Sequence, residues 1–493
     1  MSKPPPKSSL TRADIQGIYT QGEAAVISLV EGLLHQLSEH QRALKILEAR
    51  VAALENQSAK DSHNSSKPPS GDGFGKRTKS LRTKSERPSG GQQGHPGSTL
   101  EWIEEPDFTE IHKVEECQGC GLSLTQTSVQ TWETSQVHDL PPMRLQVTEH
   151  QAEVKCCPHC QTLNRGKFPL HIIGGVQYGS ALKGLMVYLS DYQLLPSQRT
   201  IELLSDVFGF SLSEGTLYNA RQRCFESLEP IEGQIIEAIQ AAPVAHFDET
   251  GARVKGKLFW LHVASSDLLT YYCIHDKRGQ IAIDEINILP HFKGVSVHDG
   301  LKSYAQYKCL HALCNAHHLR ELIFINERYA QPWAESMMKL LLDIKKQVSE
   351  SKAQGLLSLD SDVLDAFEIR YQTILNEGFT ANPFIPSDVP KSRGRPKQSP
   401  PKNLLDRLQS QQSEVLRFMH DFDVPFDNNQ AERDLRMMKL KQKISGGFRS
   451  LLGGKFFCRI RGYISTLKKQ RHNILAQLKL VFMAQPTLPL LAD

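Results

Sequence analysis

The sequence lacks long apolar runs. None approaches 18 uninterrupted apolar residues, and the start, MSKPPPKSSL, has no apolar h-region. The sequence therefore predicts no membrane span and no secretory signal. We expect a cytoplasmic location. Ten cysteines in 493 residues are too few for a disulfide scaffold, and two CxxC pairs among them indicate metal instead. Neither sign of charge dominates, because 58 Lys and Arg face 54 Asp and Glu, so only local clusters are informative.

Between Val26 and Leu54 the apolar residues recur with a heptad spacing. The spacing keeps one seam facing a partner helix, and only the polar His40 interrupts it over about four heptads. The pattern favours a short coiled coil and a homo-oligomer. A surface helix packed on its own domain is the alternative. The seam positions are Val30, Leu37, Leu44 and Val51, together with Leu33, His40, Leu47 and Leu54.

Residues 58–100 are rich in Pro, Gly and Ser and cannot bury enough apolar surface to fold alone. Eight Lys and Arg face three acidic residues over 60–95. The segment is therefore expected to be a basic disordered linker, which either attracts a polyanion or acts only as a solvated tether.

Two cysteine pairs, Cys117-x2-Cys120 and Cys157-x2-Cys160, are separated by 36 residues, in which the runs 128–140 and 144–156 alternate like strands. Four thiolates in two turns suit tetrahedral Zn²⁺, which predicts a structural zinc module. His159 and Cys156 are rival ligands. A redox pair is the alternative, although it needs only one CxxC.

Residues 178–228 have the pattern of successive helices, the last two separated at Gly209. Ser197 and Ser213 are candidate N-caps of these two helices. The pair resembles a helix-turn-helix, in which the second helix enters a DNA major groove, although helical hairpins without DNA are common. The residues expected near DNA are Thr216, Asn219, Arg221 and Arg223.

After Pro243 the pattern changes to strands, and Asp248 and Asp299 lie at the ends of two of them. Glu432 follows in an expected helix capped by Asp427 or Asn428. Three converging carboxylates hold two Mg²⁺ ions, or Mn²⁺, for phosphoryl transfer. The alternative is that the two Asp residues only form turns.

The second half of the chain contains four distinctive motifs, HFDETGARVKGKLFWLHVASS (246–266), VHDGLKSY (297–304), CNAHHLREL (314–322) and DNNQAERDLR (427–436). They are preceded by NSSKPPSGDGF (64–74), GGQQGHPG (90–97), both CxxC pairs and LPSQRTIELLSDVFGFSLSEGTLYNA (195–220). In this order the motifs resemble the IS66 family of insertion-sequence transposases. The resemblance covers nearly the whole chain, and its specificity lies in the ordered set.

This resemblance implies a DDE-type transposase, a polynucleotidyl transferase whose catalytic domain has an RNase H-like fold with a helical insertion. Asp248, Asp299 and Glu432 are carried over as the metal-binding triad, with Glu249 as the main confounder. Cys314 and His317 match a CxxH motif of similar transposases, and we interpret them as structural.

Two basic segments are candidate DNA contacts. The loop at 390–402 includes Arg393 and Arg395, with the spacing of a minor-groove arm or of a solubilising loop. Residues 432–472 contain twelve Lys and Arg against two acids, which would neutralise phosphates beside the carboxylates. Arg436, Lys443 and Arg449 are the contacts predicted there.

We therefore predict a multidomain α+β transposase that binds double-stranded DNA, both terminal inverted repeats and target, and cuts and joins it. Helper proteins of the same element are potential partners, and the protein would associate with the nucleoid when bound. A non-catalytic DNA-binding regulator, a nuclease without strand transfer and a structural coiled-coil protein are the alternatives. The expected regions are a coiled coil (20–57), the basic linker (58–100), the zinc module (101–172), a helix-turn-helix region (178–238), the first part of the RNase H-like core (240–320), a helical insertion (321–425) and the last part of the core with basic C-terminal helices (426–485).

Overall fold

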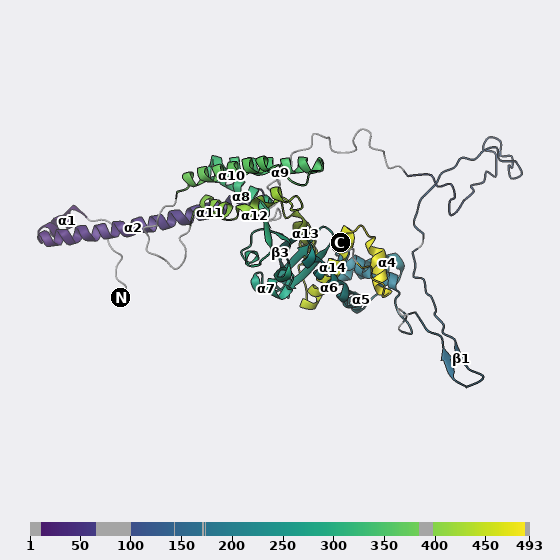
Figure 1. Cartoon of the computed structure of the whole chain (residues 1–493). Coiled ribbons are helices and arrows are strands. Elements are labelled where there is room, and N and C mark those ends of the chain that lie inside the picture. Colours follow the sequence, from purple (N-terminus) through teal and green to yellow (C-terminus); the bar gives the residue numbers. More distant parts are fainter. Residues whose placement is uncertain are drawn as a thin grey trace.

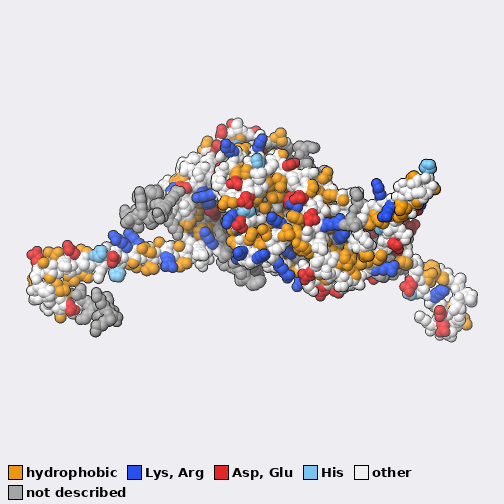
Figure 2. Space-filling model, turned by 90° about the horizontal axis from the view of Figure 1, so that it is seen from below, with side chains coloured by type: hydrophobic (Ala, Val, Ile, Leu, Met, Phe, Trp, Pro, Cys, Tyr) orange, Lys and Arg blue, Asp and Glu red, His pale blue; other side chains and the backbone are white. Residues whose placement is uncertain are grey.

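The computed structural model describes residues 11–65, 100–141, 143–169, 172, 174–383 and 398–488. They form a mixed α and β protein with a central body, from which a long helix extends on one side and a segment with a small hairpin on the other (Figure 1). Figure 2 shows the same projections, with Lys, Arg and hydrophobic side chains interspersed over the central body. None of the described helices combines the length and apolar character needed to cross a membrane.

The central body contains a mixed sheet with the strand order β5-β4-β3-β6-β7. Strands β3, β4 and β5 are antiparallel, whereas β6 and β7 run parallel to β3. The chain turns from β3 into β4 through Lys255 and Gly256, whose φ angles of 50° and 77° suit a two-residue type I′ turn. The strands are β3 (Val244–Val254), β4 (Lys257–Ser265), β5 (Thr270–His275), β6 (Val295–His298) and β7 (Leu310–Leu313).

Helices and loops cover both faces of this sheet. On one face Val254 belongs to the same core cluster as Leu435 of α13 and Phe457 of α14. On the other face the ring of Phe247 packs against Phe292 and Tyr304, near α7. The polar side chains of His246, Glu249 and Thr250 on β3 are therefore buried. The helices are α7 (Gln280–Ile286), α13 (Asn429–Ser445) and α14 (Leu451–Lys469).

The helices that precede the sheet share a core with the last helix of the chain. Gly184 of α3 lies so close to α15 that a Cβ there would be 2.9 Å from the backbone nitrogen of Lys479. The Ser213 hydroxyl caps α5 by accepting from Thr216 N, as predicted, whereas α4 begins after Pro196 without a side-chain cap from Ser197. The elements are α3 (Ser180–Val187), the π-helix η2 (Tyr188–Tyr192), α4 (Ser197–Phe208), α5 (Glu214–Ser227), α6 (Glu229–Ala241) and α15 (Ile474–Phe482).

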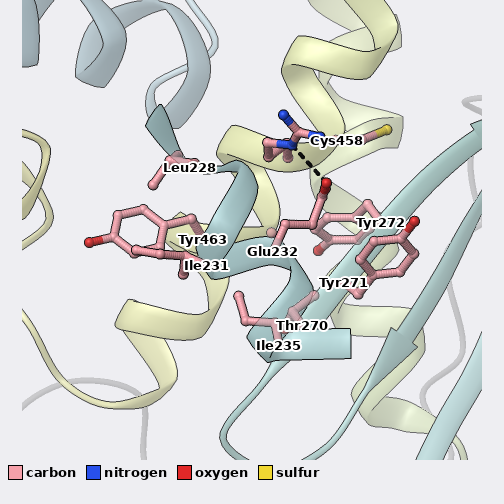
Figure 3. Close-up of a pocket in the computed structure, with 11 residues that line it drawn as sticks. Leu228, Ile231, Glu232, Ile235, Thr270, Tyr271, Tyr272, Cys458 and Tyr463 are labelled. Carbon is pink, nitrogen blue, oxygen red and sulfur yellow. Dashed lines mark hydrogen bonds and ion pairs between the residues drawn. The ribbon is translucent and has the colours of Figure 1, made fainter. Parts of the chain in front are cut away.

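A small pocket marks the junction of α6, β5 and α14 (Figure 3). Its lining includes Ile235 and Tyr463, and Glu232 reaches in from α6. The Glu232 carboxylate accepts from Nε of Arg459 at 2.7 Å. This ion pair joins α6 to α14, and the pocket contains none of the candidate catalytic carboxylates.

Between β7 and α13 the described part of the chain is mainly helical, and it shares a hydrophobic core with β6 and β7. Trp333, Leu341 and Tyr371 are buried in it. Because α8 follows β7 directly, it begins at the edge of the sheet. The helices are α8 (Asn315–Tyr329), α9 (Pro332–Ala353), α10 (Ser361–Ala381), α11 (Pro400–Ser410) and α12 (Gln412–His420).

The N-terminal region consists of α1 (Arg12–Tyr19) and the long helix α2 (Glu23–Ser58). The heptad seam of α2 is exposed, as at Leu44. After α2, residues 59–65 do not leave the body as a free tether. They form turns against the end of α8, and Asn64 is buried there. The rest of the expected linker, 66–99, lies outside the described residues.

The cysteine-containing region has little regular structure. Its hairpin consists of β1 (Val154–Cys156) and β2 (Leu163–Arg165). The alternation over 128–140 predicts a strand, and this prediction is wrong. Alternation alone does not form a strand without a partner strand and an apolar surface to cover, and Val137 is 87% exposed.

Candidate active site

Asp248 lies on the face of β3 that α13 covers. Side chains alternate along a strand, so Asp248 shares its face with Val254, which belongs to the same core cluster as α13 residues. Glu249 points to the opposite face and lies across from His262 of β4. Because of this alternation, the side chain of Asp248, and not that of Glu249, faces α13, the helix that carries Glu432.

Asp299 reaches the same place through the parallel pairing of β3 with β6. His246 pairs with Val297, and two residues further along each chain come Asp248 and Asp299. Carboxylate oxygens of Asp248, Glu249 and Asp299 lie within 4.8 Å of one another. The first two predicted catalytic carboxylates are thus brought together.

Glu432 lies in the first turn of α13, which Asn428 fixes against β3. The Asn428 Oδ1 is 2.8 Å from Nδ1 of His246, and its Nδ2 donates to the Phe247 carbonyl at 2.9 Å. Asn428 is therefore the N-cap by position, but its side chain binds the strand and does not cap the helix. These two contacts of Asn428 place Glu432 close enough to Asp248 for the charge of Glu432 to contribute to the raised pKa of Asp248.

Cys314 and His317 also lie beside Glu432. The Cys314 Sγ accepts a hydrogen bond from the backbone N–H of Asn428 at 3.2 Å, so it helps to hold the start of α13. Burial raises the pKa of the Cys314 thiol to about 12. One ligand atom from each of Cys314, His317 and Glu432 lies within 4.8 Å of the others, so the group is also capable of binding a metal.

The site is electrostatically strained. Burial, with the neighbouring charges of Glu249 and Asp299, raises the pKa of Asp248 well above its ordinary value. Lys439 opposes this accumulation of negative charge. Partial burial lowers the pKa of Lys439, and the charge of Asp248 offsets part of this lowering. Such a cluster favours binding of a cation.

Glu249 has both carboxylate oxygens occupied. Nε of Arg278 donates to one at 2.7 Å, and the Tyr304 hydroxyl donates to the other at 2.6 Å. Burial raises the pKa of Glu249, while the bonds from Tyr304 and Arg278 lower it. Glu249 is thus a buried carboxylate with two side-chain donors, whereas Asp248 accepts from the backbone N–H of Glu249 at 2.8 Å.

Sequence reasoning missed four residues of this site. Lys439 follows Glu432 by seven residues, which is two helical turns, so helical spacing could have found it. Asn428 was considered only as a cap. For Arg278 and Tyr304 no periodic signal exists, because Arg278 lies in an irregular segment after β5 and Tyr304 lies in the short 3-10 helix η4 (Tyr304–Gln306).

The four DNA contacts predicted on α5 differ in their surroundings. Asn219 and Arg223 are exposed and lie four residues apart on one side of the helix. The Thr216 hydroxyl lies 3.0 Å from that of Ser213 at the cap. Arg221 is not free, because its guanidinium makes two bonds of 2.7 Å to the buried Asp191. We therefore correct its assignment from a DNA contact to an internal ion pair.

The basic segment 432–472 is likewise partly internal. Arg436, Lys443 and Arg449 are exposed. Arg461 is buried, and Lys469 donates to Asp434 at 3.0 Å. With Arg459, these residues brace α14 and do not present charge to a partner. The predicted contacts Arg393 and Arg395 lie outside the described residues.

Each cysteine pair closes a turn. In the first, the N–H of Gly121 donates to the carbonyl of Cys117 at 2.8 Å, and backbone N–H groups lower the pKa of the Cys117 thiol. In the second, Gln161 N donates to the carbonyl of Cys157 at 2.9 Å. These turns suit metal ligation, but the groups of three or more close ligand atoms found among the described residues do not include the four sulfurs.

Comparison with known families identifies two matching regions. The model of the Transposase IS66 family matches residues 175–456, which is more than half of the chain and includes the three candidate carboxylates. A family of unknown function (DUF6444) matches residues 3–101. The chain matches no curated protein.

Proposed function

The chain belongs to the IS66 family of transposases, and from that premise we propose that it is a DDE-type enzyme whose triad is Asp248, Asp299 and Glu432. It binds the terminal inverted repeats of its element, cuts the DNA and joins the 3′-OH ends to target DNA. The observation that carries this proposal is the close approach of Asp248 on β3 to Asp299 after β6, with Glu432 of α13 near enough for its charge to act on Asp248.

The sheet supports the RNase H-like fold that the family resemblance implies. Its order places three antiparallel strands beside two parallel ones, with β3 at the centre. The first carboxylate lies on this central strand and the second follows its parallel neighbour β6. The helical segment between β7 and α13 takes the position of an insertion before the third.

The donor set fits Mg²⁺ or Mn²⁺, because the clustered carboxylate oxygens are hard ligands. When bound, these ions would activate the attacking hydroxyl and stabilise the leaving oxygen. The chain contributes the geometry. Strand pairing aligns Asp248 with Asp299, Asn428 holds the helix of Glu432, and Lys439 offsets part of the negative charge.

The DNA surface is proposed to include the exposed residues of α5 and α13. Asn219 and Arg223 on α5 would face bases or phosphates in a helix-turn-helix arrangement. Arg436, Lys443 and Arg449 would neutralise phosphates beside the carboxylates, so binding should weaken steeply with salt. Thr216, Arg393 and Arg395 remain secondary candidates.

Zinc binding and self-association complete the proposal. Cys117, Cys120, Cys157 and Cys160 would hold one structural Zn²⁺ after their two turns approach each other, since each turn already directs N–H groups that favour a thiolate. The exposed seam of α2 would pair with the same helix of a second copy. Helper proteins of the same element would assist assembly.

The proposal is tested with labelled DNA that carries the terminal inverted repeats of the element. Cleavage and joining with Mg²⁺ or Mn²⁺ are measured for the wild type, Asp299→Ala and Glu432→Ala, and binding is measured in parallel. Asp365→Ala removes an exposed carboxylate of the insertion and is the control. We expect both triad variants to bind DNA and to lose all detectable chemistry, while the control retains it.

Other outcomes separate the alternatives. Cleavage without joining would favour a nuclease. Binding without chemistry in the wild type, with helper proteins supplied, would favour a regulator. Full activity of Asp299→Ala would overturn the assignment of the triad.

A further inference from the structure

Arg278 lies beside the carboxylate cluster and is held there by two neighbours. It follows β5, on the face of the sheet opposite α13. Its Nε donates to Glu249, whose side chain is completely buried, while 43% of the Arg278 side chain is exposed. Its Cζ lies 4.8 Å from the centroid of the Trp260 ring. An ion pair and a stacking contact therefore fix a guanidinium whose outer part faces solvent.

The outer nitrogens of this guanidinium are available. Within the part of the chain that the structure describes, Nη1 and Nη2 of Arg278 have no hydrogen-bond partner. Glu249 cannot move toward a metal without losing its bonds to Arg278 and Tyr304. Its buried carboxylate thus acts as the anchor of the arginine.

The anchored guanidinium also lies within electrostatic reach of the catalytic cluster. Glu249 contributes to that cluster through an oxygen within 4.8 Å of those of Asp248 and Asp299. Burial lowers the pKa of Arg278, but its hydrogen bond to Glu249 and the charges of Glu249 and Asp299 raise it above its ordinary value. A fixed guanidinium fork is suited to two hydrogen bonds with the oxygens of a phosphodiester.

We propose that Arg278 binds a phosphodiester of the DNA strand at or next to the scissile bond, with Glu249 and Trp260 as positioning residues. This inference rests on the proposed function. The phosphate would lie between the carboxylate cluster and the guanidinium, where Arg278 offsets the negative charge that increases as the bond breaks.

The first test compares two adjacent cations. Arg278→Ala and Lys277→Ala each remove one positive charge, but Lys277 is exposed, and among the described residues its ammonium pairs only with Asp276, at 3.3 Å. In single-turnover cleavage at saturating DNA, we expect a loss of about 100-fold or more for Arg278→Ala. The rate of Lys277→Ala should stay within about twofold of wild type. Equal rates for the two variants would overturn the proposal.

A second variant excludes a purely structural role. Arg278→Ala leaves the buried Glu249 carboxylate without its cation, which alone could disturb the site. Glu249→Gln combined with Arg278→Ala removes that unpaired charge. If Arg278 only neutralises Glu249, the double variant recovers the wild-type rate. If Arg278 binds DNA, the double variant stays as slow as Arg278→Ala.

A neutral DNA linkage reports the contact itself. Methylphosphonate is placed at successive linkages around the cleavage point. At the linkage that Arg278 contacts, wild type should slow and Arg278→Ala should show no further loss. Additive losses at every linkage would contradict the contact. Wild-type activity that depends on Asp299 is measured alongside, so failure of the proposed function is distinguished from failure of this inference.

Discussion

Two regions of the molecule differ in what can stabilise them. In the sheet, Val297 and Leu261 are fully buried and both faces are covered. In the cysteine-containing region 100–172, Phe108 is 94% exposed and Val147 is 91% exposed. Hydrophobic burial offsets the entropy of ordering the chain in the first region but has little to offer in the second. The second region must be stabilised by something other than a core, and its cysteines make metal the candidate.

Removal of the proposed zinc should therefore have the largest effect, confined to one region. Structural zinc contributes about 10–16 kcal/mol to comparable small modules. Cys157→Ser or chelation of the metal should abolish the protection from hydrogen exchange of the backbone amides of Gly121 and Gln161, which lie in the two cysteine turns. Unfolding of the sheet should stay unchanged. Cys156→Ser is the matched control, and unchanged exchange after chelation would exclude zinc as the support.

Matched phenylalanine substitutions sharpen the contrast. Phe456 is 1% exposed and packs against Phe225 with ring centroids 5.0 Å apart. Phe456→Ala should lower the free energy of unfolding by about 3–5 kcal/mol, because it opens a cavity. Phe108→Ala should change it by less than about 0.5 kcal/mol. Denaturant titration measures both, and a similar cost for the two would refute the distinction.

The same contrast explains which features were predictable from sequence. The Ser213 cap and the helix α5 follow from local signals, and strand alternation could have separated Asp248 from Glu249. The internal pair of Arg221 and Asp191 depends on contacts across 30 residues, which a single sequence does not reveal. The strand predicted over 128–140 failed for the opposite reason, since a correct local pattern found no partner.

A smaller effect is expected where the buried core contains charge. The folded protein holds a proton on Asp248 more tightly than the unfolded chain, whose Asp pKa is about 3.9, because burial and nearby carboxylates raise its pKa. The folded state thus binds more protons, and this contribution to stability is lost as pH rises through the raised pKa. Asp248→Asn should remove this loss of stability with rising pH, and it should also abolish catalysis.

Without divalent metal and above the raised pKa, Asp248→Asn should be more stable than wild type by about 1 kcal/mol, or about 2–4 °C in Tm. The difference should vanish near pH 4. Thermal unfolding across pH measures this, with Asp365→Asn as the exposed control. A variant less stable than wild type at every pH would show that Asp248 is structurally required.

The smallest effect is expected at the contact between α2 and α8. This contact is polar, so it is intermediate between the buried sheet and the exposed cysteine-containing region. Arg328 forms an ion pair with Glu55, and its Nε donates to Asn56 Oδ1 at 3.2 Å. Arg328→Ala should weaken this docking by no more than about 1 kcal/mol, because the ion pair is exposed. Hydrogen exchange over 55–65 should then rise by up to about fivefold, with the sheet unaffected. Faster exchange in the sheet as well would mean that the contacts between α2 and α8 also stabilise the sheet.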